Sequence, residues 1–140
     1  MSTADLETTP PVAAGIFTLP PFDREPPRLL GGICPGCQKR YFPRPLYCPT
    51  CLGSLQECSI GSKGIIHSFT VVRTKAPLGL PQPYSVGYID MEESGLRVFC
   101  LLDPSAMDRL RVGLKMALAV ERLGHDGNGE PRLRPYFTPL

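Results

Sequence analysis

The sequence predicts a mainly β protein in two unequal parts, a small cysteine-rich module and a larger strand-rich domain. Seventeen prolines and fourteen glycines in 140 residues leave little room for long helices, because proline removes a backbone donor and clashes inside a helix. Two Cys-x-x-Cys pairs, separated by ten residues, stand in the stretch ICPGCQKRYFPRPLYCPTC. Several later segments alternate apolar and polar residues, as half-buried strands do.

The N-terminal part, residues 1–30, is rich in proline and is predicted to form an extended arm. Proline restricts both itself and the residue before it to extended geometry. We expect residues 1–14 to be a disordered leader, because they offer few apolar side chains. Further along, three apolar side chains are expected to anchor the arm on another surface: Phe17, Leu19 and Phe22.

Residues 31–58 form the predicted cysteine module, whose four paired thiols suit one tetrahedral Zn²⁺ in a rubredoxin-like zinc ribbon. Each Cys-x-x-Cys turn can present two sulfurs about 2.3 Å from the metal. Four thiolates leave no position for water, so the zinc is expected to be structural. Redox dithiols or an iron–sulfur cluster are the alternatives. The expected ligands are Cys34, Cys37, Cys48 and Cys51.

The module is too small to bury enough apolar surface for stability, so metal binding must supply its folding free energy. Two further cysteines fall outside the paired spacing. Cys58 is expected to be a spare buried thiol, and Cys100 to pack in the core from the apolar face of a strand.

Residues 59–140 are predicted to form an OB-fold domain. Their expected order is strand, loop, strand, strand, short helix, strand and strand, as in a five-stranded OB barrel with its helix between strands three and four. Asp103 and Pro104 suit the N-cap and the first position of that helix. The expected strands cover residues 63–73, 84–93, 95–103, 113–123 and 131–140, and their apolar faces include Leu96, Val98, Cys100 and Leu102, and Leu114, Met116, Leu118 and Val120.

The charge balance is modest, with 15 Lys and Arg against 13 Asp and Glu. A nucleic-acid binder normally carries a basic stripe, whereas the longest basic run here is Lys39-Arg40. The N-terminus has no positively charged region typical of a signal peptide, and no stretch approaches the ~20 apolar residues of a membrane span. We therefore expect a cytoplasmic protein without a membrane partner, in which thiols stay reduced.

No arrangement typical of an independent enzyme is recognisable in the sequence. The two histidines are His67, inside a predicted strand, and His125, in a glycine-rich turn. A lone strand histidine is more often structural than catalytic. We expect no catalytic residue in this chain.

Five motifs, in their order and spacing, resemble a known family, the zinc-ribbon/OB-fold acyl-CoA-associated proteins long catalogued as a domain of unknown function. The motifs are CPGC…YFPRPLYCPTC, GSKGIIHSFTVVR, PYSVGYIDM, LRVGLKMALAVERL and RLRPYFTP, within roughly residues 30–138. The resemblance implies a non-catalytic accessory subunit that docks on a thiolase-like catalytic subunit in a hetero-oligomer. It also implies a CoA thioester as the substrate of the complex, at or near the interface.

Within this family the chain looks most similar to small subunits of degradative thiolases, which implies breakdown of an aromatic or another acyl-CoA. One stretch departs from the family pattern. Members commonly begin with a short helical segment before the first Cys-x-x-Cys, where this chain has FTLPPFDREPPRLLGG. An extended arm is expected to replace that helix, because its prolines disfavour one.

The alternative function is binding of single-stranded nucleic acid, which zinc ribbons and OB folds serve elsewhere. Such binders line a groove with stacking aromatics and many cations. The predicted strands carry Phe69, Tyr84, Tyr88 and Phe99, with only Lys63, Arg73, Lys75 and Arg97 near them. The sparse cations and the family resemblance favour the accessory subunit.

One loop, residues 73–84, is too long for a simple hairpin turn and combines cations with an apolar tip. Arg73 and Lys75 suit phosphates, while Leu78 and Leu80 suit an acyl group. These four residues are the expected contacts to the partner or to acyl-CoA. The alternative is an ordinary surface loop.

Overall fold

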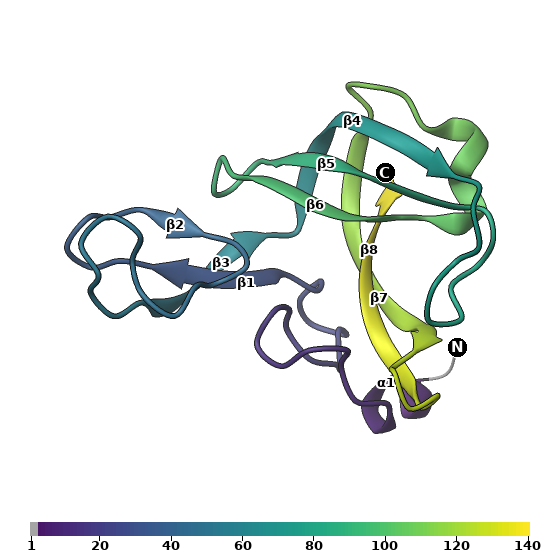
Figure 1. Cartoon of the computed structure of the whole chain (residues 1–140), viewed down its shortest axis with the longest axis horizontal. Helices are drawn as coiled ribbons and strands as arrows, with labels where there is room; N and C mark the ends of the chain where they lie inside the picture. The colour runs from purple at the N-terminus through teal and green to yellow at the C-terminus, as the bar shows by residue number, and fades with distance from the viewer. Residues whose placement is uncertain (1–2) are drawn as a thin grey trace.

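The computed structural model describes residues 3–140, whose strands form a three-stranded sheet and a closed five-stranded barrel. In Figure 1 the smaller sheet projects from one side of the barrel. The mainly β class, the N-terminal cysteine-rich ribbon and the five-stranded barrel predicted from the sequence are thus confirmed. Residues 1 and 2, which begin the predicted leader, lie outside the described residues.

The smaller sheet, the ribbon, has β1 (Leu29–Ile33) between β2 (Arg40–Tyr41) and β3 (Gln56–Gly61). Both strand pairs are antiparallel. Gly31 is required in β1 by close packing, because a Cβ there would collide with the Tyr41 carbonyl oxygen. The two cysteine-bearing loops follow β1 and β2 at the outer end of the ribbon, and β3 leads almost directly into the barrel.

The barrel strands follow the order β4-β5-β6-β8-β7 around a closed sheet. Adjacent strands are antiparallel except β6 and β8, which pair in parallel. This confirms the predicted element order of an OB fold. The elements are β4 (Lys63–Val72), β5 (Tyr84–Met91), β6 (Arg97–Leu102), the 3₁₀-helix η1 (Pro104–Arg109), β7 (Lys115–His125) and β8 (Pro131–Pro139).

Helix η1 starts where the sequence predicts. The Asp103 carboxylate accepts hydrogen bonds from the backbone N–H (2.8 Å) and hydroxyl (2.7 Å) of Ser105, and from the Thr138 hydroxyl on β8 (2.7 Å). Burial raises the pKa of Asp103, but the hydrogen bonds from Thr138 and Ser105 outweigh it and leave the pKa lowered. No helix within residues 3–140 is long and apolar enough to cross a membrane.

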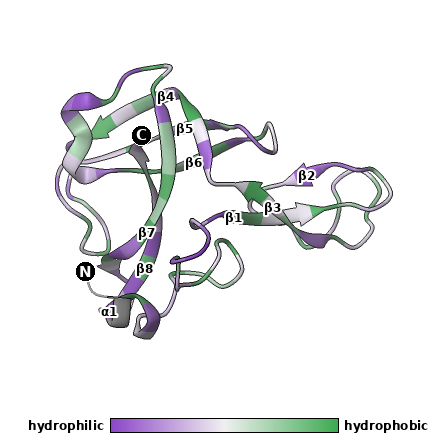
Figure 2. Cartoon of the chain, turned by 180° about the vertical axis from the view of Figure 1, so that it is seen from behind, coloured by the Kyte–Doolittle hydropathy of each residue, from purple (hydrophilic) through white to green (hydrophobic). Residues whose placement is uncertain are grey.

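The barrel core consists of side chains that alternate inward along the strands. Both predicted apolar faces are confirmed, since Val98 and Leu102 on β6 are buried, as are Met116, Leu118 and Val120 on β7. The other residues predicted on these faces pack against the same core: Leu96, Cys100 and Leu114. Figure 2 shows the alternation as changes of colour along the strands, with further hydrophobic segments in the loops at the outer end of the ribbon.

The N-terminal segment is ordered against the barrel, unlike the disordered leader expected for residues 1–14. Its described part begins with the helix α1 (Thr3–Thr8), after which the backbone pairs with the edge of β8. The Val12 N–H donates to the Leu133 carbonyl (2.9 Å), and the Leu133 N–H donates to the Pro10 carbonyl (2.8 Å). The segment is ordered because it satisfies backbone groups at a strand edge, which a hydrophobicity pattern does not reveal.

The three predicted anchors of the arm behave differently. Phe17 is only 2% exposed and bridges Leu29 in β1, so it joins the ribbon to the barrel core. Phe22 packs partly buried against that core. Leu19 does not anchor the arm on this chain, because its side chain is 59% exposed.

Candidate metal centre

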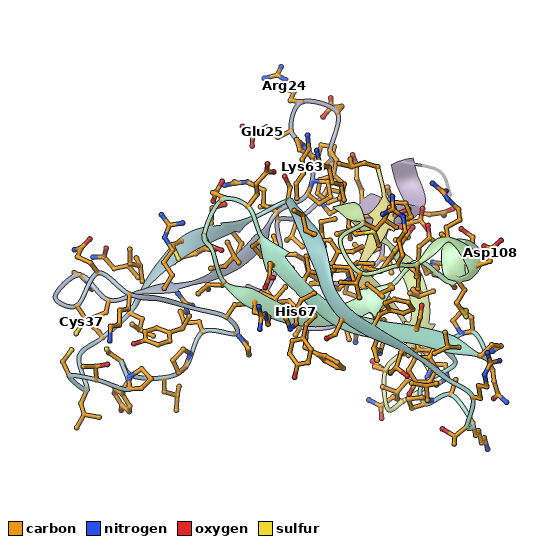
Figure 3. All side chains as sticks on the ribbon, turned by 90° about the horizontal axis from the view of Figure 1, so that it is seen from above. Arg24, Glu25, Cys37, Lys63, His67 and Asp108 are labelled. Atoms are coloured by element: carbon orange, nitrogen blue, oxygen red, sulfur yellow. The ribbon has the colours of Figure 1, made fainter. Side chains whose placement is uncertain are left out.

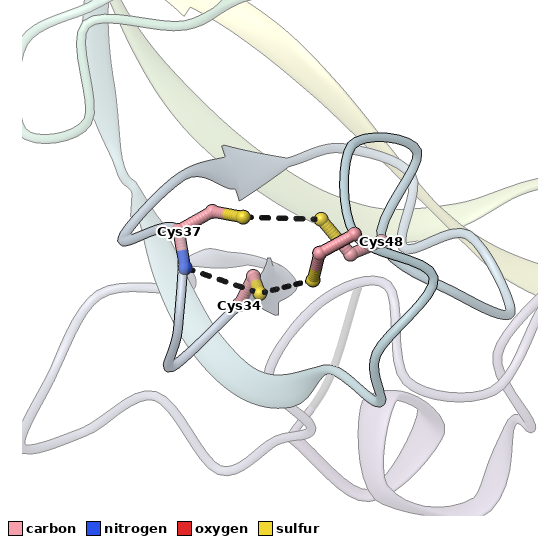
Figure 4. A group of neighbouring side chains, drawn as sticks. Cys34, Cys37 and Cys48 are labelled. Carbon is pink, nitrogen blue, oxygen red and sulfur yellow. Dashed lines mark hydrogen bonds between the residues drawn. The ribbon is translucent and has the colours of Figure 1, made fainter.

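The four predicted ligand cysteines converge at the outer end of the ribbon, with all four Sγ atoms within 4.8 Å of one another. Figure 4 labels three of them, Cys34, Cys37 and Cys48. The Cys34 and Cys51 sulfurs are 3.5 Å apart, and those of Cys37 and Cys48 are 3.9 Å apart. A tetrahedral site with Zn–S bonds of about 2.3 Å has sulfurs roughly 3.8 Å apart. The spacing therefore fits one zinc ion.

Both cysteine loops use the same local geometry. The Gln38 N–H donates to the Cys34 carbonyl, and the Leu52 N–H donates to the Cys48 carbonyl, each at 2.8 Å. Gln38 and Leu52 both adopt left-handed backbone conformations, with φ of 58° and 63°. This conformation is unfavourable for a bulky residue such as leucine, and here it turns the chain so that both sulfurs of a pair face the same point.

The electrostatics of the cluster favour a bound cation. The pKa of the Cys48 thiol is lowered to about 6, first because the Cys51 backbone N–H donates to its sulfur. The neighbouring sulfurs of Cys51 and Cys34 raise the pKa of Cys37 to about 12. One thiolate forms readily, whereas further ionisation without a metal crowds negative charge, and a divalent cation relieves this repulsion.

This donor set fits a structural site. Four sulfur ligands close a tetrahedral zinc and leave no position for a water that could be activated. Cys34 and Cys48 are buried, while Cys51 is exposed. Among residues 3–140, no second group of three or more His, Cys, Asp or Glu side chains lies close enough to bind a metal.

The remaining cysteines have no reactive environment. Burial raises the pKa of Cys100 to about 12, which keeps the thiol protonated, and its sulfur lies 3.7 Å from the Pro135 carbonyl oxygen. This fits the expected core packing. Cys58, expected to be buried, is half-buried beside the same core, and burial raises its pKa.

Each histidine is engaged by a neighbouring oxygen. The Nδ1 atom of His67 lies 3.8 Å from an Asp90 carboxylate oxygen on the outside of the barrel. The Nδ1 atom of His125 lies 2.7 Å from the Asp126 carbonyl oxygen. Neither contact is the cysteine–histidine pairing of a nucleophilic site.

The loop of residues 73–84 folds back on the turn between β7 and β8. The His125 N–H donates to the Leu78 carbonyl (2.8 Å). Gly79 has a positive φ of 69°, and a Cβ there would collide with the His125 ring. These contacts fix the position of the loop.

The four residues predicted as partner or acyl-CoA contacts differ in exposure. Arg73 and Lys75 are exposed near the start of the loop, and Leu78 is 43% exposed at its tip. Leu80 is half-buried beside Tyr84 and Leu123. The loop therefore exposes two cations and one leucine, while Leu80 mainly packs internally.

The sequence analysis named four strand aromatics without saying which are exposed, and the structure exposes two of them on the barrel. The side chains of Tyr88 and Phe99 are 44% and 57% exposed, with ring centroids 5.2 Å apart. Phe69 and Tyr84 are half-buried instead. A register shift between Ile66 and Ser68 in β4 lies beside Phe69. Tyr88 and Phe99 occupy outward positions of the period-two patterns of β5 and β6.

The comparisons with protein families agree with both parts of the structure. Residues 24–56 match the family model described as "ChsH2, rubredoxin-like zinc ribbon domain". Residues 59–121 match "ChsH2, C-terminal OB-fold domain". The zinc-ribbon and OB-fold assignments made from the sequence are thereby confirmed.

Two relatives align with most of the chain. Benzoylsuccinyl-CoA thiolase subunit BbsA of Thauera aromatica is 31% identical over 121 residues, which cover 86% of this chain and 82% of that protein. A DUF35 domain-containing scaffold protein of Methanothermobacter thermautotrophicus (strain ATCC 29096 / DSM 1053 / JCM 10044 / NBRC 100330 / Delta H) is 29% identical over 102 residues, or 71% and 76% of the two chains. The resemblance to thiolase small subunits is confirmed by the first of these.

Among solved structures, a chain of the Ltp2-ChsH2(DUF35) aldolase has the same fold. The TM-score is 0.64 at 24% identity, and the match covers 80% of this chain and 84% of that one. At this identity the likeness supports the fold and not a shared activity.

Proposed function

Because the chain belongs to the family of ChsH2-type zinc-ribbon and OB-fold proteins, we propose that it is a non-catalytic accessory subunit of a thiolase-type acyl-CoA acyltransferase complex. The observation that carries this proposal is the 31% identity to a thiolase subunit over most of both chains. We propose that the complex degrades an aromatic or another acyl-CoA. Its location would be the cytoplasm, where thiols remain reduced.

We propose that each chain binds one structural Zn²⁺ through Cys34, Cys37, Cys48 and Cys51. The sulfur–sulfur distances of 3.5 and 3.9 Å support this assignment. Elemental analysis is expected to give one zinc per chain. Absence of zinc, or visible charge-transfer bands from iron, would contradict the assignment.

The catalytic residues are proposed to lie in the partner chain. Thiolase chemistry needs a nucleophilic cysteine with acid and base groups beside it. Here Cys100 has a pKa raised to about 12 by burial. The histidines contact oxygens of Asp90 and Asp126, which are not nucleophiles for this reaction. We propose that the chain instead docks on the catalytic subunit and shapes its acyl-CoA site, a role that the similarity to a thiolase subunit supports.

The loop of residues 73–84 is proposed to reach toward that acyl-CoA site. Arg73 and Lys75 would meet CoA phosphates and Leu78 the acyl group, while Leu80 supports the loop from within. The double variant Arg73→Ala/Lys75→Ala and the variant Leu78→Ser should lower CoA affinity or turnover while assembly persists. Normal turnover by both variants would make the loop an ordinary connection.

Co-purification tests the accessory role. The chain is co-expressed with the thiolase-type chain of its own genome, and one tagged chain is used to isolate the other. We expect a stable hetero-oligomer, so that both chains elute together from the affinity column and from size-exclusion chromatography. Failure of the two chains to associate at micromolar concentrations would contradict the proposal.

Nucleic-acid binding remains the alternative function, but the aromatic surface lacks the cations it needs. Only Tyr88 and Phe99 of the four strand aromatics are well exposed, and the neighbouring Arg97 is held by Asp90 at 2.7 Å. Salt-sensitive micromolar binding of a single-stranded oligonucleotide would favour this alternative.

A further inference from the structure

The outer surface of β4, β5 and β6 carries an aromatic face, defined as Ser68, Thr70, Val86, Tyr88 and Phe99. Strand register explains why these side chains lie together, because Tyr88 pairs with both Ser68 and Phe99, while Val86 pairs with Thr70. Positions that point outward from a barrel into water are normally polar. Here valine, tyrosine and phenylalanine occupy three of them.

The aromatic face contains a shallow open hollow of about 190 Å³ beside the two rings. Its walls are almost entirely apolar. Sites that enclose small ligands usually measure about 300–1,000 Å³ and bury most of the ligand. This hollow is too small and too open to enclose a CoA thioester, but it suits single protruding side chains of a protein surface.

The charges around the aromatic face cancel. Arg97 donates two hydrogen bonds to the Asp90 carboxylate, at 2.7 and 3.3 Å, and this contact lowers the pKa of Asp90. His67 lies 3.8 Å from the same carboxylate, on the outside of the barrel as Figure 3 shows. A neutral apolar partner complements this arrangement, whereas a polyanion would find the Arg97 guanidinium already paired with Asp90.

A second copy of this chain fits the aromatic face poorly. In a symmetric dimer the same five residues would form both sides of the contact, far fewer than the roughly 20–30 residues that each side of a stable interface contributes. Stable interfaces bury roughly 800 Å² on each partner. A larger chain that curves around the barrel can reach that area.

We propose that the aromatic face is the surface on which the thiolase-type catalytic chain docks, with Tyr88 and Phe99 as its apolar anchors. This inference rests on the proposed accessory function and adds the location of the contact. Exposed aromatic side chains at the centre of an interface carry much of its binding free energy. The Asp90–Arg97 ion pair forms part of the rim, where both charges remain satisfied.

The test measures the Kd between purified, zinc-loaded chain and the thiolase-type chain of its genome. The double variant Tyr88→Ser/Phe99→Ser should weaken Kd at least about 30-fold, as expected for anchor residues. Tyr88→Phe, which keeps the ring, and Val112→Ser, an equally exposed apolar side chain elsewhere (65%), should remain near wild type. Melting temperature and zinc content verify folding, and the single serine variants replace the double variant if it melts early.

The possible results separate this inference from the accessory function. If wild type binds the catalytic chain and the serine variants bind equally well, the docking surface lies elsewhere, although the accessory function stands. If wild type binds no thiolase-type chain, both are overturned. Loss in the serine variants of a homodimer seen by light scattering, or of binding to a fluorescent oligothymidylate, would assign the face to another partner and overturn the inference.

Discussion

The ribbon and the barrel are held together by different means. The barrel buries a continuous apolar core that includes Ile89, Met116 and Phe137, each at 0% exposure. The outer end of the ribbon instead leaves large apolar side chains in water, with Leu46 89% and Leu52 75% exposed. Its order depends on the sulfur cluster, which we propose is closed by zinc. One chain thus contains a core-stabilised part and a ligand-stabilised part.

The two parts are not independent at their junction. Leu29 and Ile60 at the base of the ribbon belong to the same core cluster as Phe17 of the N-terminal segment and Ile66 of the barrel. The base of the ribbon should therefore unfold together with the barrel, while the order of its outer end should depend on metal binding. Perturbations placed at the outer end, in the core and at the junction should give three distinct results.

Cys48→Ser is expected to produce the largest difference in stability between the outer end of the ribbon and the barrel. Loss of one ligand removes a large share of the roughly 10–16 kcal/mol that zinc binding supplies in small zinc modules. The ribbon end should lose zinc and hydrogen-exchange protection, while the barrel keeps its circular-dichroism signal. Cys58→Ser, outside the cluster, is the control and should retain zinc. An ordered, zinc-loaded Cys48→Ser variant would contradict the distinction.

The reverse perturbation is Phe137→Ala in the barrel. This side chain is fully buried, so its truncation should lower the free energy of unfolding by about 3–5 kcal/mol. Denaturant unfolding measures the effect, and the folded fraction should still hold one zinc per chain. The exposed control Val112→Ala should change stability by less than about 0.5 kcal/mol. An effect of Phe137→Ala as small as the control would show that the barrel does not depend on this core.

The junction is tested by Phe17→Ala. We expect the free energy of unfolding to fall by about 3 kcal/mol, because Phe17 is almost fully buried in the core shared by the ribbon base and the barrel. Proteolysis should become faster in residues 9–28. Leu19→Ala, at an exposed position two residues away, should have almost no effect. Equal effects of the two variants on stability would mean that the N-terminal segment does not hold the ribbon and the barrel together through Phe17.

The smallest effect is expected from Asp103→Asn. Weakening the hydrogen bonds to Ser105 and Thr138 should cost about 1 kcal/mol at neutral pH. The pKa of Asp103 is lowered in the folded state. Its contribution is therefore present above the unfolded pKa of about 3.9 and is lost as pH falls through the folded pKa.

Denaturant unfolding between pH 2 and 7 checks this prediction. On acidification, the free energy of unfolding of Asp103→Asn should fall by less than that of wild type. Asp108→Asn, an exposed change on the same helix (Figure 3), is the matched control and should behave like wild type. If the stability of Asp103→Asn depended on pH as that of wild type does, the Asp103 carboxylate would not stabilise the contact between η1 and β8.

Features set by local sequence were predictable. The paired cysteine spacing indicated the sulfur cluster, and period-two patterns identified β6 and β7 with their buried residues Val98 and Met116. Asp103 followed by Pro104 marked the start of η1. In each case the signal lies within a few neighbouring residues, which is why reasoning from spacing succeeded.

Features set by contacts between distant residues were not predictable from spacing. The pairing of the Pro10–Val12 backbone with Leu133 joins residues more than 120 positions apart in the chain, so no local pattern indicates it. The half-buried position of Phe69 follows a register shift between Ile66 and Ser68 in β4, which the sequence pattern does not mark. Leu19 and Phe17 look alike in the sequence, and only the pairing of Phe17 with Leu29 in β1 and its place in the core distinguish them.

The central claim, that this chain is a non-catalytic but required subunit, is tested most directly by reconstituted turnover. The chain and the thiolase-type chain of its genome are purified separately, and CoA-dependent cleavage of 3-oxoacyl-CoA substrates, including aromatic ones, is measured for each alone and for the mixture. We predict no turnover by this chain, little by the partner, and full turnover only in the mixture. Turnover by this chain alone, or full turnover by the partner alone, would contradict the account.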